Sequence, residues 1–200
     1  MNQEPITILL QRVSSGEKEL LNDIYSRLYA DIKQIAEYQI NKLNTGQTIT
    51  PTVLTHDCYL KIAKQNNINV KNSSHFLNCL SISMRQLLID VCRSKSSSKK
   101  QHITVTDTFD DIIGDTNIGF KVMELDFLLK KVEIISVQYA EILNYKLILS
   151  MTFAEIGEAT NKSERQVIRV WNQAKALLMA LANGETTNGA TPNTNLEAGS

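Results

Sequence analysis

Apolar residues recur at every third or fourth position through long stretches of the chain, and this period constrains the fold more than any other feature. Over about residues 17–40 the apolar side chains share one helical face, formed by Leu20, Leu21, Ile24, Leu28, Ile32, Ile35 and Ala36. A second face of this kind spans about residues 74–93. Only 8 glycines and 3 prolines occur in 200 residues, so few positions break a helix. We therefore expect an all-α protein.

The sequence predicts two helical domains joined by a flexible connector. The connector begins with the basic run SKSSSKK and continues as the acidic, turn-rich TDTFDDIIGDTNIG, and neither part has a sustained helical period. The C-terminal end is polar and low in complexity, which favours disorder. The expected limits are 1–94 for the first helical domain, 95–119 for the connector, 120–182 for the second helical domain and 183–200 for a disordered tail.

Two polar loops divide the first domain into helices. The loop NKLNTGQTITP ends at Pro51, which can open the next helix because its missing N–H has no partner in a first turn anyway. That helix should end near Lys64, and the loop QNNINVKNSS should lead into the helix over about 74–93. Residues 6–13 form a short apolar run before the first long helix.

Several classes of protein are disfavoured. Cys58, Cys79 and Cys92 lie in apolar helical stretches without ligand spacing, so we expect reduced core thiols and a cytoplasmic protein. We expect no secretory signal, because MNQEPITILLQRV lacks a basic region followed by a long apolar region. We expect no membrane span, because no run approaches about 18 apolar residues. The sequence has no Gly-rich phosphate loop and no H-E-x-x-H, and its three histidines are dispersed. We expect no enzyme, no metal and no cofactor.

The strongest local motif is TFAEIGEATNKSERQVIRVWNQAKALL, whose pattern is typical of a helix-turn-helix. Gly157 would allow a close approach of the two helices. Asn161 tolerates the left-handed backbone of the turn, and Ser163 is a good N-cap for the second helix. The buried stripe of that helix should be Val167, Val170, Trp171, Ala174, Leu177 and Leu178.

The opposite face of this second helix carries groups that can bind DNA. Arg and Lys can pair with guanine or phosphate, whereas Gln and Asn can pair with adenine. Because the first residues of such a helix meet base edges, Arg165, Gln166 and Arg169 are the base-reading candidates, and Lys175 is a phosphate candidate. The full candidate set is Ser163, Arg165, Gln166, Arg169, Asn172 and Lys175. The alternative is an ordinary helical hairpin with a solvated polar face.

The first domain resembles extracytoplasmic-function (ECF) sigma factors of bacterial RNA polymerase. The segments that carry the resemblance are GQTITPTVLTHDCYLKIAKQ and SSHFLNCLSISMRQLLIDVCRSKSSSKKQ, followed after a connector by the helix-turn-helix. The resemblance implies that the first domain binds the polymerase clamp and reads the downstream (minus-10) promoter element. It also implies that the last domain reads the upstream (minus-35) element.

The resemblance assigns three groups of residues in this chain. The clamp-binding residues would be Leu54, His56, Asp57 and Lys61, with Val53, Tyr59 and Ile62 packed inward. Unpaired bases would be trapped by Asn72, Ser73, Ser74 and His75. Phosphates would be tracked by Arg85, Arg93, Lys95, Lys99 and Lys100. The alternatives are a solvated helix face, an N-cap cluster and a plain flexible linker, respectively.

The acidic connector resembles the sigma linker that passes through the RNA path of the polymerase. Its carboxylates would then imitate nucleic-acid charge within a basic channel, although a solvated acidic loop fits equally well. These residues are Asp107, Asp110, Asp111 and Asp115.

The chain departs from the family pattern in the second domain. Asn161 stands where many relatives have Gly, Lys162 replaces an apolar residue, and Ile168 and Val170 occupy positions that are often polar. Residues 126–183 contain seven basic and six acidic residues, a net charge of +1. A DNA-binding domain with so little net positive charge should bind free DNA weakly.

The weak expected affinity leaves room for further partners. An activator or an RNA-guided DNA-binding complex could place the protein, with exposed Ile168 or Val170 in the contact, and an anti-sigma factor is a further partner to consider. Two rival functions remain. One is a free-standing helix-turn-helix regulator that binds an operator as a dimer, and the other is an adaptor that binds polymerase without reading promoters.

Overall fold

The computed structural model describes residues 4–42, 49–64, 73–98 and 122–188, and within these ranges the chain is helical without any strand. The expectation of an all-α protein is therefore confirmed for the described residues. The helices are α1 (Ile6–Ser14), α2 (Leu20–Lys42), α3 (Pro51–Ala63), α4 (Ser73–Ser98), α6 (Val122–Ile135), α7 (Val137–Leu147), α8 (Phe153–Thr160) and α9 (Glu164–Asn188).

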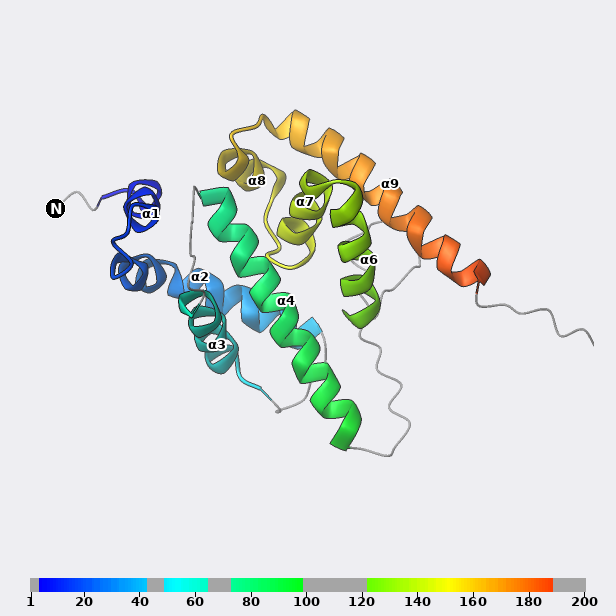
Figure 1. Ribbon diagram of the computed structural model, residues 1–200, viewed down its shortest axis with the longest axis horizontal. Coiled ribbons are helices and arrows are strands. Elements are labelled where there is room, and N and C mark those ends of the chain that lie inside the picture. The colour runs from blue at the N-terminus through cyan, green and yellow to red at the C-terminus, as the bar shows by residue number, and fades with distance from the viewer. Residues whose placement is uncertain (1–3, 43–48, 65–72, 99–121, 189–200) are drawn as a thin grey trace, which may run out of the picture.

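Helix α4 joins two groups of helices, as Figure 1 shows. On one side α4 contacts α1 and α3, and on the other side it contacts α6, α7 and α8. Helix α9 packs across α6, α7 and α8. The buried apolar side chains of both groups form one continuous core. The groups follow the order of the two expected domains, but in this conformation they pack against each other.

Local sequence explains where several helices begin. Helix α3 starts at Pro51, as expected, and the side chain of Thr50 accepts a hydrogen bond from the Val53 N–H. Helix α7 starts after Ser136, whose hydroxyl oxygen accepts a hydrogen bond from the Tyr139 N–H. Both are N-caps that satisfy one of the free N–H groups of a first helical turn.

Two helices end later than the sequence predicted. Helix α4 continues to Ser98 through the first residues of the expected connector, and α9 continues to Asn188 through the first residues of the expected tail. Adding residues to an existing helix costs little once the helix has formed, so polar Ser, Lys and Asn residues can prolong it. The rest of the connector, with its four aspartates, and residues 189–200 lie outside the described residues.

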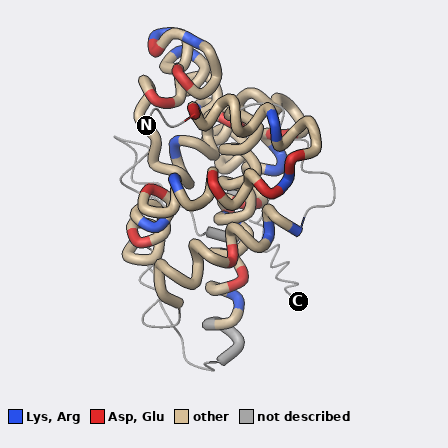
Figure 2. Tube along the Cα trace, turned by 90° about the vertical axis from the view of Figure 1, so that its left-hand side faces the viewer, with Lys and Arg blue, Asp and Glu red and all other residues tan. Residues whose placement is uncertain are grey.

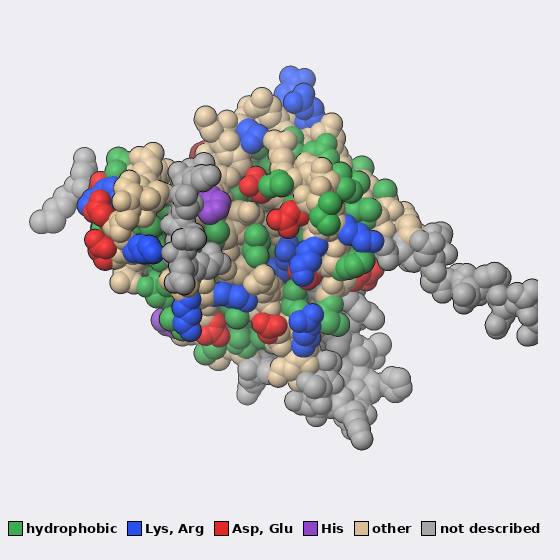
Figure 3. All heavy atoms as spheres, viewed as in Figure 1, with side chains coloured by type: hydrophobic (Ala, Val, Ile, Leu, Met, Phe, Trp, Pro, Cys, Tyr) green, Lys and Arg blue, Asp and Glu red, His purple; other side chains and the backbone are tan. Residues whose placement is uncertain are grey.

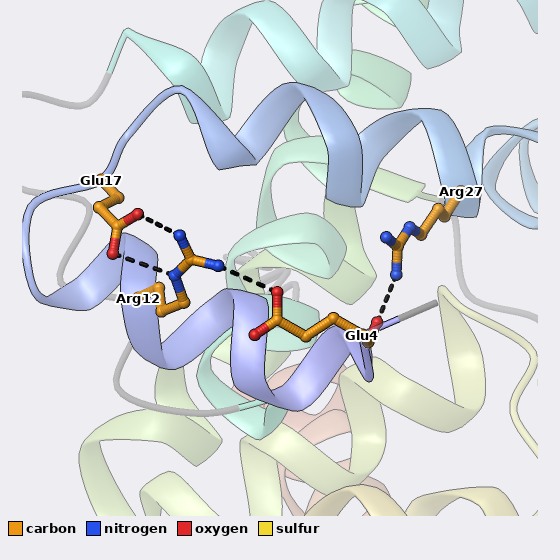
Figure 4. Close-up of polar contacts among 4 residues, drawn as sticks. All are labelled: Glu4, Arg12, Glu17 and Arg27. Atoms are coloured by element: carbon orange, nitrogen blue, oxygen red, sulfur yellow. Dashed lines mark hydrogen bonds and ion pairs between the residues drawn. The ribbon is translucent and has the colours of Figure 1, made fainter. Parts of the chain in front are cut away.

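The short apolar run near the N-terminus forms α1, which buries Leu9, Leu10 and Val13. Arg12 of this helix forms ion pairs with one carboxylate before the helix and one after it, as Figure 4 shows. Arg12 contacts the carboxylates of Glu4 at 3.0 Å and Glu17 at 2.5 Å. The hydrogen bond to Glu17 is the main reason why the pKa of Arg12 is raised. Because these groups are exposed to water, the ion pairs contribute little to the stability of the fold.

An aromatic cluster attaches α3 to α2. The rings of Tyr25 and Tyr59 lie 4.5 Å apart, and the ring of Tyr29 lies 5.7 Å from that of His56. The buried Tyr25 hydroxyl donates to the Thr55 carbonyl. Burial is the main cause of the raised pKa of Tyr25.

None of the described helices combines the length and the apolar character that a bilayer-spanning segment needs.

Candidate nucleic-acid interface

The segment that connects α7 to α9 is held by two capping boxes. In α8, the Glu155 N–H donates to Thr152 Oγ1 at 3.2 Å, and the Thr152 N–H donates to Glu155 Oε2 at 2.7 Å. That backbone hydrogen bond is the main reason why the pKa of Glu155 is lowered. In α9, Gln166 N–H donates to Ser163 Oγ at 3.3 Å, and Ser163 N–H donates to Gln166 Oε1 at 2.8 Å. Both helices therefore begin at sharply defined residues.

The turn between α8 and α9 has the geometry that the sequence predicted for its key residues. Asn161 adopts φ 54° and ψ 45°, which is the left-handed conformation. A Cβ atom on Gly157 would lie 2.7 Å from the carbonyl oxygen of Lys162. The expected close approach at Gly157 thus exists, but the neighbour is the backbone of the turn. Ser163 caps α9, as expected.

Most of the predicted upstream-element residues share the outer side of α9. Val167, Ala174 and Leu178 face the core, whereas the side chains of five candidates are exposed and Lys175 is half-buried. The five exposed residues are Ser163, Arg165, Gln166, Arg169 and Asn172. Figure 3 shows basic side chains projecting at the edge of the molecule where α9 begins. Gln166 is occupied in the capping box, so base contact by its side chain would require that bond to be exchanged.

Ile168 and Val170, the two residues of α9 that depart from the family pattern, lie on different sides of the helix. Ile168 is 37% exposed and lies beside the candidate DNA contacts, but Val170 is only 7% exposed. The expectation that Val170 offers an exposed apolar contact is therefore wrong, whereas its expected place in the buried stripe with Val167 and Ala174 is confirmed.

A polar pocket of about 380 Å³ lies beside this face, between the start of α7 and the middle of α9. Lys162 and Arg169 are the cations on its wall, and Lys162 is half-buried. The other lining residues are Gln138, Tyr139, Gln166, Val170 and Gln173. The unusual Lys162 is therefore accommodated at a polar boundary of the core. Burial raises the pKa of Glu141, and the positive charge of Lys162 opposes this effect.

The predicted polymerase-binding residues of α3 are divided by burial. Leu54 is fully buried together with Cys58 and Ile62, whereas Val53 is 47% exposed. The expectation that Leu54 faces outward and Val53 inward is wrong, because Leu54, Cys58 and Ile62 form the i, i+4, i+8 stripe that meets the core. The sequence contained this spacing, but the prediction assigned Val53 to the inner face in place of Leu54, whereas Ile62 is buried as expected.

The outer face of α3 nevertheless keeps the three predicted polar residues. His56 is exposed, and Asp57 and Lys61 are half-buried. Val53 and Leu60 are large apolar side chains that share this face and were not predicted. We call the five residues the outer face of α3: Val53, His56, Asp57, Leu60 and Lys61.

The predicted downstream-element residues are spread along α4. Asn72 lies outside the described residues, as do Lys99 and Lys100 and the side chain of Lys95. Ser73, Ser74 and His75 form the first turn of α4 and are half-buried, and Arg93 is exposed near its other end. Ser74 is engaged by the second group of helices, since the Tyr145 hydroxyl donates to its carbonyl oxygen at 2.7 Å.

Arg85 lies on α4 but is only 3% exposed. Its Nη1 donates to Asn144 Oδ1 at 2.6 Å, and its Nε lies 3.0 Å from Asp126 Oδ1. The Nε–H is not aligned with that oxygen, so the second contact is an ion pair without a hydrogen bond. In this conformation Arg85 cannot reach a phosphate in solvent.

Charges of both signs are interspersed along the chain, as Figure 2 shows. The formal net charge is zero. The described structure therefore offers local basic groups at α9 rather than a broad basic surface, and the expectation that free DNA is bound weakly stays a prediction.

Comparison with known proteins identifies the family. The family model described as ECF sigma factor matches residues 3–183, and the chain therefore belongs to this family. No match was found among curated proteins or among solved structures. The chain is a sigma factor for promoter recognition by RNA polymerase, and its partners are core RNA polymerase and promoter DNA. The family consists of transcription initiation factors, not enzymes.

Proposed function

We propose that this sigma factor directs core RNA polymerase to specific promoters through three surfaces. The outer face of α3 binds the polymerase clamp, the start of α4 engages the minus-10 element, and the exposed side of α9 reads the minus-35 element. The two nucleic-acid surfaces would act in the cytoplasm, where polymerase and DNA meet.

The observation that carries this proposal is the α8–turn–α9 geometry. The left-handed Asn161 and the Ser163 cap hold the start of α9 in a fixed position, with Arg165 and Arg169 exposed beside each other. A rigid first turn with long basic side chains suits insertion into a major groove. Nearly neutral charge in this part of the chain means that polymerase supplies much of the grip on DNA.

A pull-down of core RNA polymerase tests the polymerase-binding surface. We expect stoichiometric capture by the wild-type chain and loss of capture when Asp57→Arg and Lys61→Glu are combined. The matched control combines Asp31→Arg with Lys33→Glu on α2, which makes the same charge changes outside the outer face of α3. Equal capture by all three proteins would contradict this assignment.

A second candidate function is a sigma factor that depends on another DNA-targeting partner. The exposed apolar side chain of Ile168, which lies among the polar residues of α9, favours such a contact. An activator or an RNA-guided complex would be partners of this kind. Efficient initiation at a defined promoter by polymerase and this chain alone would contradict the dependence. An anti-sigma partner stays a prediction.

A further inference from the structure

Two of the residues assigned to DNA contact are already bound by the second group of helices. Ser74 and Arg85 both lie on the side of α4 that meets α6 and α7. Ser74 is held by the Tyr145 hydroxyl, which donates to its carbonyl and lies 3.0 Å from its Oγ. Arg85 is held by Asp126 and Asn144. A nucleic acid could not reach either residue in this arrangement.

The oxygen atoms that contact Arg85 resemble those of a bound phosphate, because they accept from or pair with a guanidinium. A guanidinium carries five N–H donors and does not lose its charge, so a buried arginine needs acceptor oxygens around it. Asp126 supplies a carboxylate and Asn144 supplies an amide oxygen, both from the second group of helices. Burial acts to lower the pKa of Arg85, and the charge of Asp126 opposes this effect. A phosphodiester carries anionic oxygens that can accept hydrogen bonds from the same guanidinium N–H groups.

Asp126 has two cationic neighbours. Its Oδ2 lies 2.8 Å from the Lys130 Nζ, and its Oδ1 lies 3.0 Å from the Arg85 Nε. Lys130 belongs to the same helix as Asp126 and is mostly exposed. The carboxylate would therefore keep one cationic partner if Arg85 moved to another anion, so exchange of Arg85 does not leave Asp126 isolated.

A third polar contact fastens α7 to the first group. The side-chain amide of Gln39 on α2 donates to the carbonyl oxygens of Leu147 at 3.1 Å and Ile148 at 2.7 Å. These carbonyls lie at the C-terminal end of α7, where helical partners are missing. One surface of the first group of helices thus contains Gln39, Ser74 and Arg85, and α6 and α7 pack on this surface.

We propose that helices α6 and α7 compete with a nucleic-acid backbone for Arg85 and Ser74. In the free chain, Asp126 and Asn144 occupy the place of a phosphate beside Arg85. The Tyr145 hydroxyl contacts the carbonyl oxygen and the Oγ of Ser74. Binding of single-stranded DNA along α4 requires α6 and α7 to leave this surface. The proposal rests on the proposed role of α4 in DNA contact.

The test uses the full chain without polymerase and a fluorescein-labelled pool of random-sequence single-stranded DNA. Asp126→Asn weakens the intramolecular ion pair but leaves every proposed DNA contact in place. We expect its affinity, measured by fluorescence anisotropy, to rise about tenfold, the factor expected when one charge-assisted contact is lost from the closed form. Adding Arg85→Ala to this variant should abolish the gain.

The matched control is Glu124→Gln. It removes one carboxylate from the same helix, but Glu124 is exposed and lies two residues from Asp126. The same rise in affinity for Glu124→Gln and Asp126→Asn would reduce the effect to net charge and overturn the proposal. An unchanged affinity for Asp126→Asn, with wild-type helicity by circular dichroism, would also overturn it.

Hydrogen exchange of the wild-type chain covers the case in which Asp126→Asn fails to fold. Saturating single-stranded DNA should increase amide exchange in α6 and α7 as these helices leave α4. Unchanged exchange with DNA bound would overturn the proposal. Neither measurement contains polymerase, so a failure of core capture would contradict the proposed function without deciding the competition for α4.

Discussion

The turn between α8 and α9 can be tested by adding a single methyl group at Gly157. The new Cβ would lie 2.7 Å from the Lys162 carbonyl oxygen and 3.5 Å from the Glu164 nitrogen. The first distance is far below van der Waals contact, and its partner is backbone that cannot rotate away. The turn that positions Ser163 and the start of α9 must therefore shift. We expect a strain of roughly 1–3 kcal/mol, the usual cost of overpacking.

Gly184→Ala is a matched control for Gly157→Ala. Gly184 also lies within a helix, but nothing lies within 4 Å of its added Cβ. Both substitutions gain about 1 kcal/mol of helix propensity, so the difference between their free energies of unfolding isolates the strain at Gly157. Each kcal/mol corresponds to about 2–4 °C in Tm for a chain of this size.

Thermal unfolding followed by circular dichroism gives both Tm values. We expect Gly184→Ala to unfold above the wild type and Gly157→Ala to unfold well below Gly184→Ala. Binding of promoter DNA by the holoenzyme should fall for Gly157→Ala alone, since α9 is displaced. An equal rise in Tm for both variants would refute the close approach on which the turn geometry depends.

Three further predictions concern α9 and α7. Ser163→Ala removes the N-cap of α9 and should destabilise the protein by about 1 kcal/mol in urea unfolding, whereas Ser163→Asp should retain most of the stability. Arg169→Ala should reduce the slope of log affinity against log salt for promoter DNA by about 1 if the residue contacts a phosphate, and an unchanged slope would exclude that contact. Burial raises the pKa of Tyr145 to about 12, so its contribution is complete below the ordinary value near 10 and is lost as the pH rises through 12. Tyr145→Phe should therefore lose less stability than the wild type between pH 10 and 12, and identical alkaline losses would contradict this prediction.

Local features of the fold were predictable because their causes are local in sequence. Pro51 opens α3, Asn161 adopts a left-handed conformation and Ser163 caps α9, and each depends on the chemistry of one residue and its near neighbours. Helical faces were predictable where many apolar positions repeat. In the shorter α3 few positions define the inner face, so the prediction exchanged Val53 for Leu54 although Ile62 was placed correctly.

The contacts of Arg85 could not be predicted from the sequence. An arginine on a helix is usually exposed, and its buried partners Asp126 and Asn144 come from a different group of helices. No short-range pattern indicates that these residues meet. Two of the residues that were predicted to contact DNA, Ser74 and Arg85, thus lie in the contact between the two groups, which only the three-dimensional arrangement reveals.

Run-off transcription on fragmented genomic DNA from the source bacterium tests whether this chain selects promoters for the polymerase. Cognate core polymerase is supplied with the wild-type chain, with no added factor, or with the combined Asp57→Arg and Lys61→Glu variant. We expect a small set of defined start sites that appear only with the wild-type chain and share an upstream and a downstream sequence element. Start sites that do not depend on the chain would contradict its role as the factor that selects promoters.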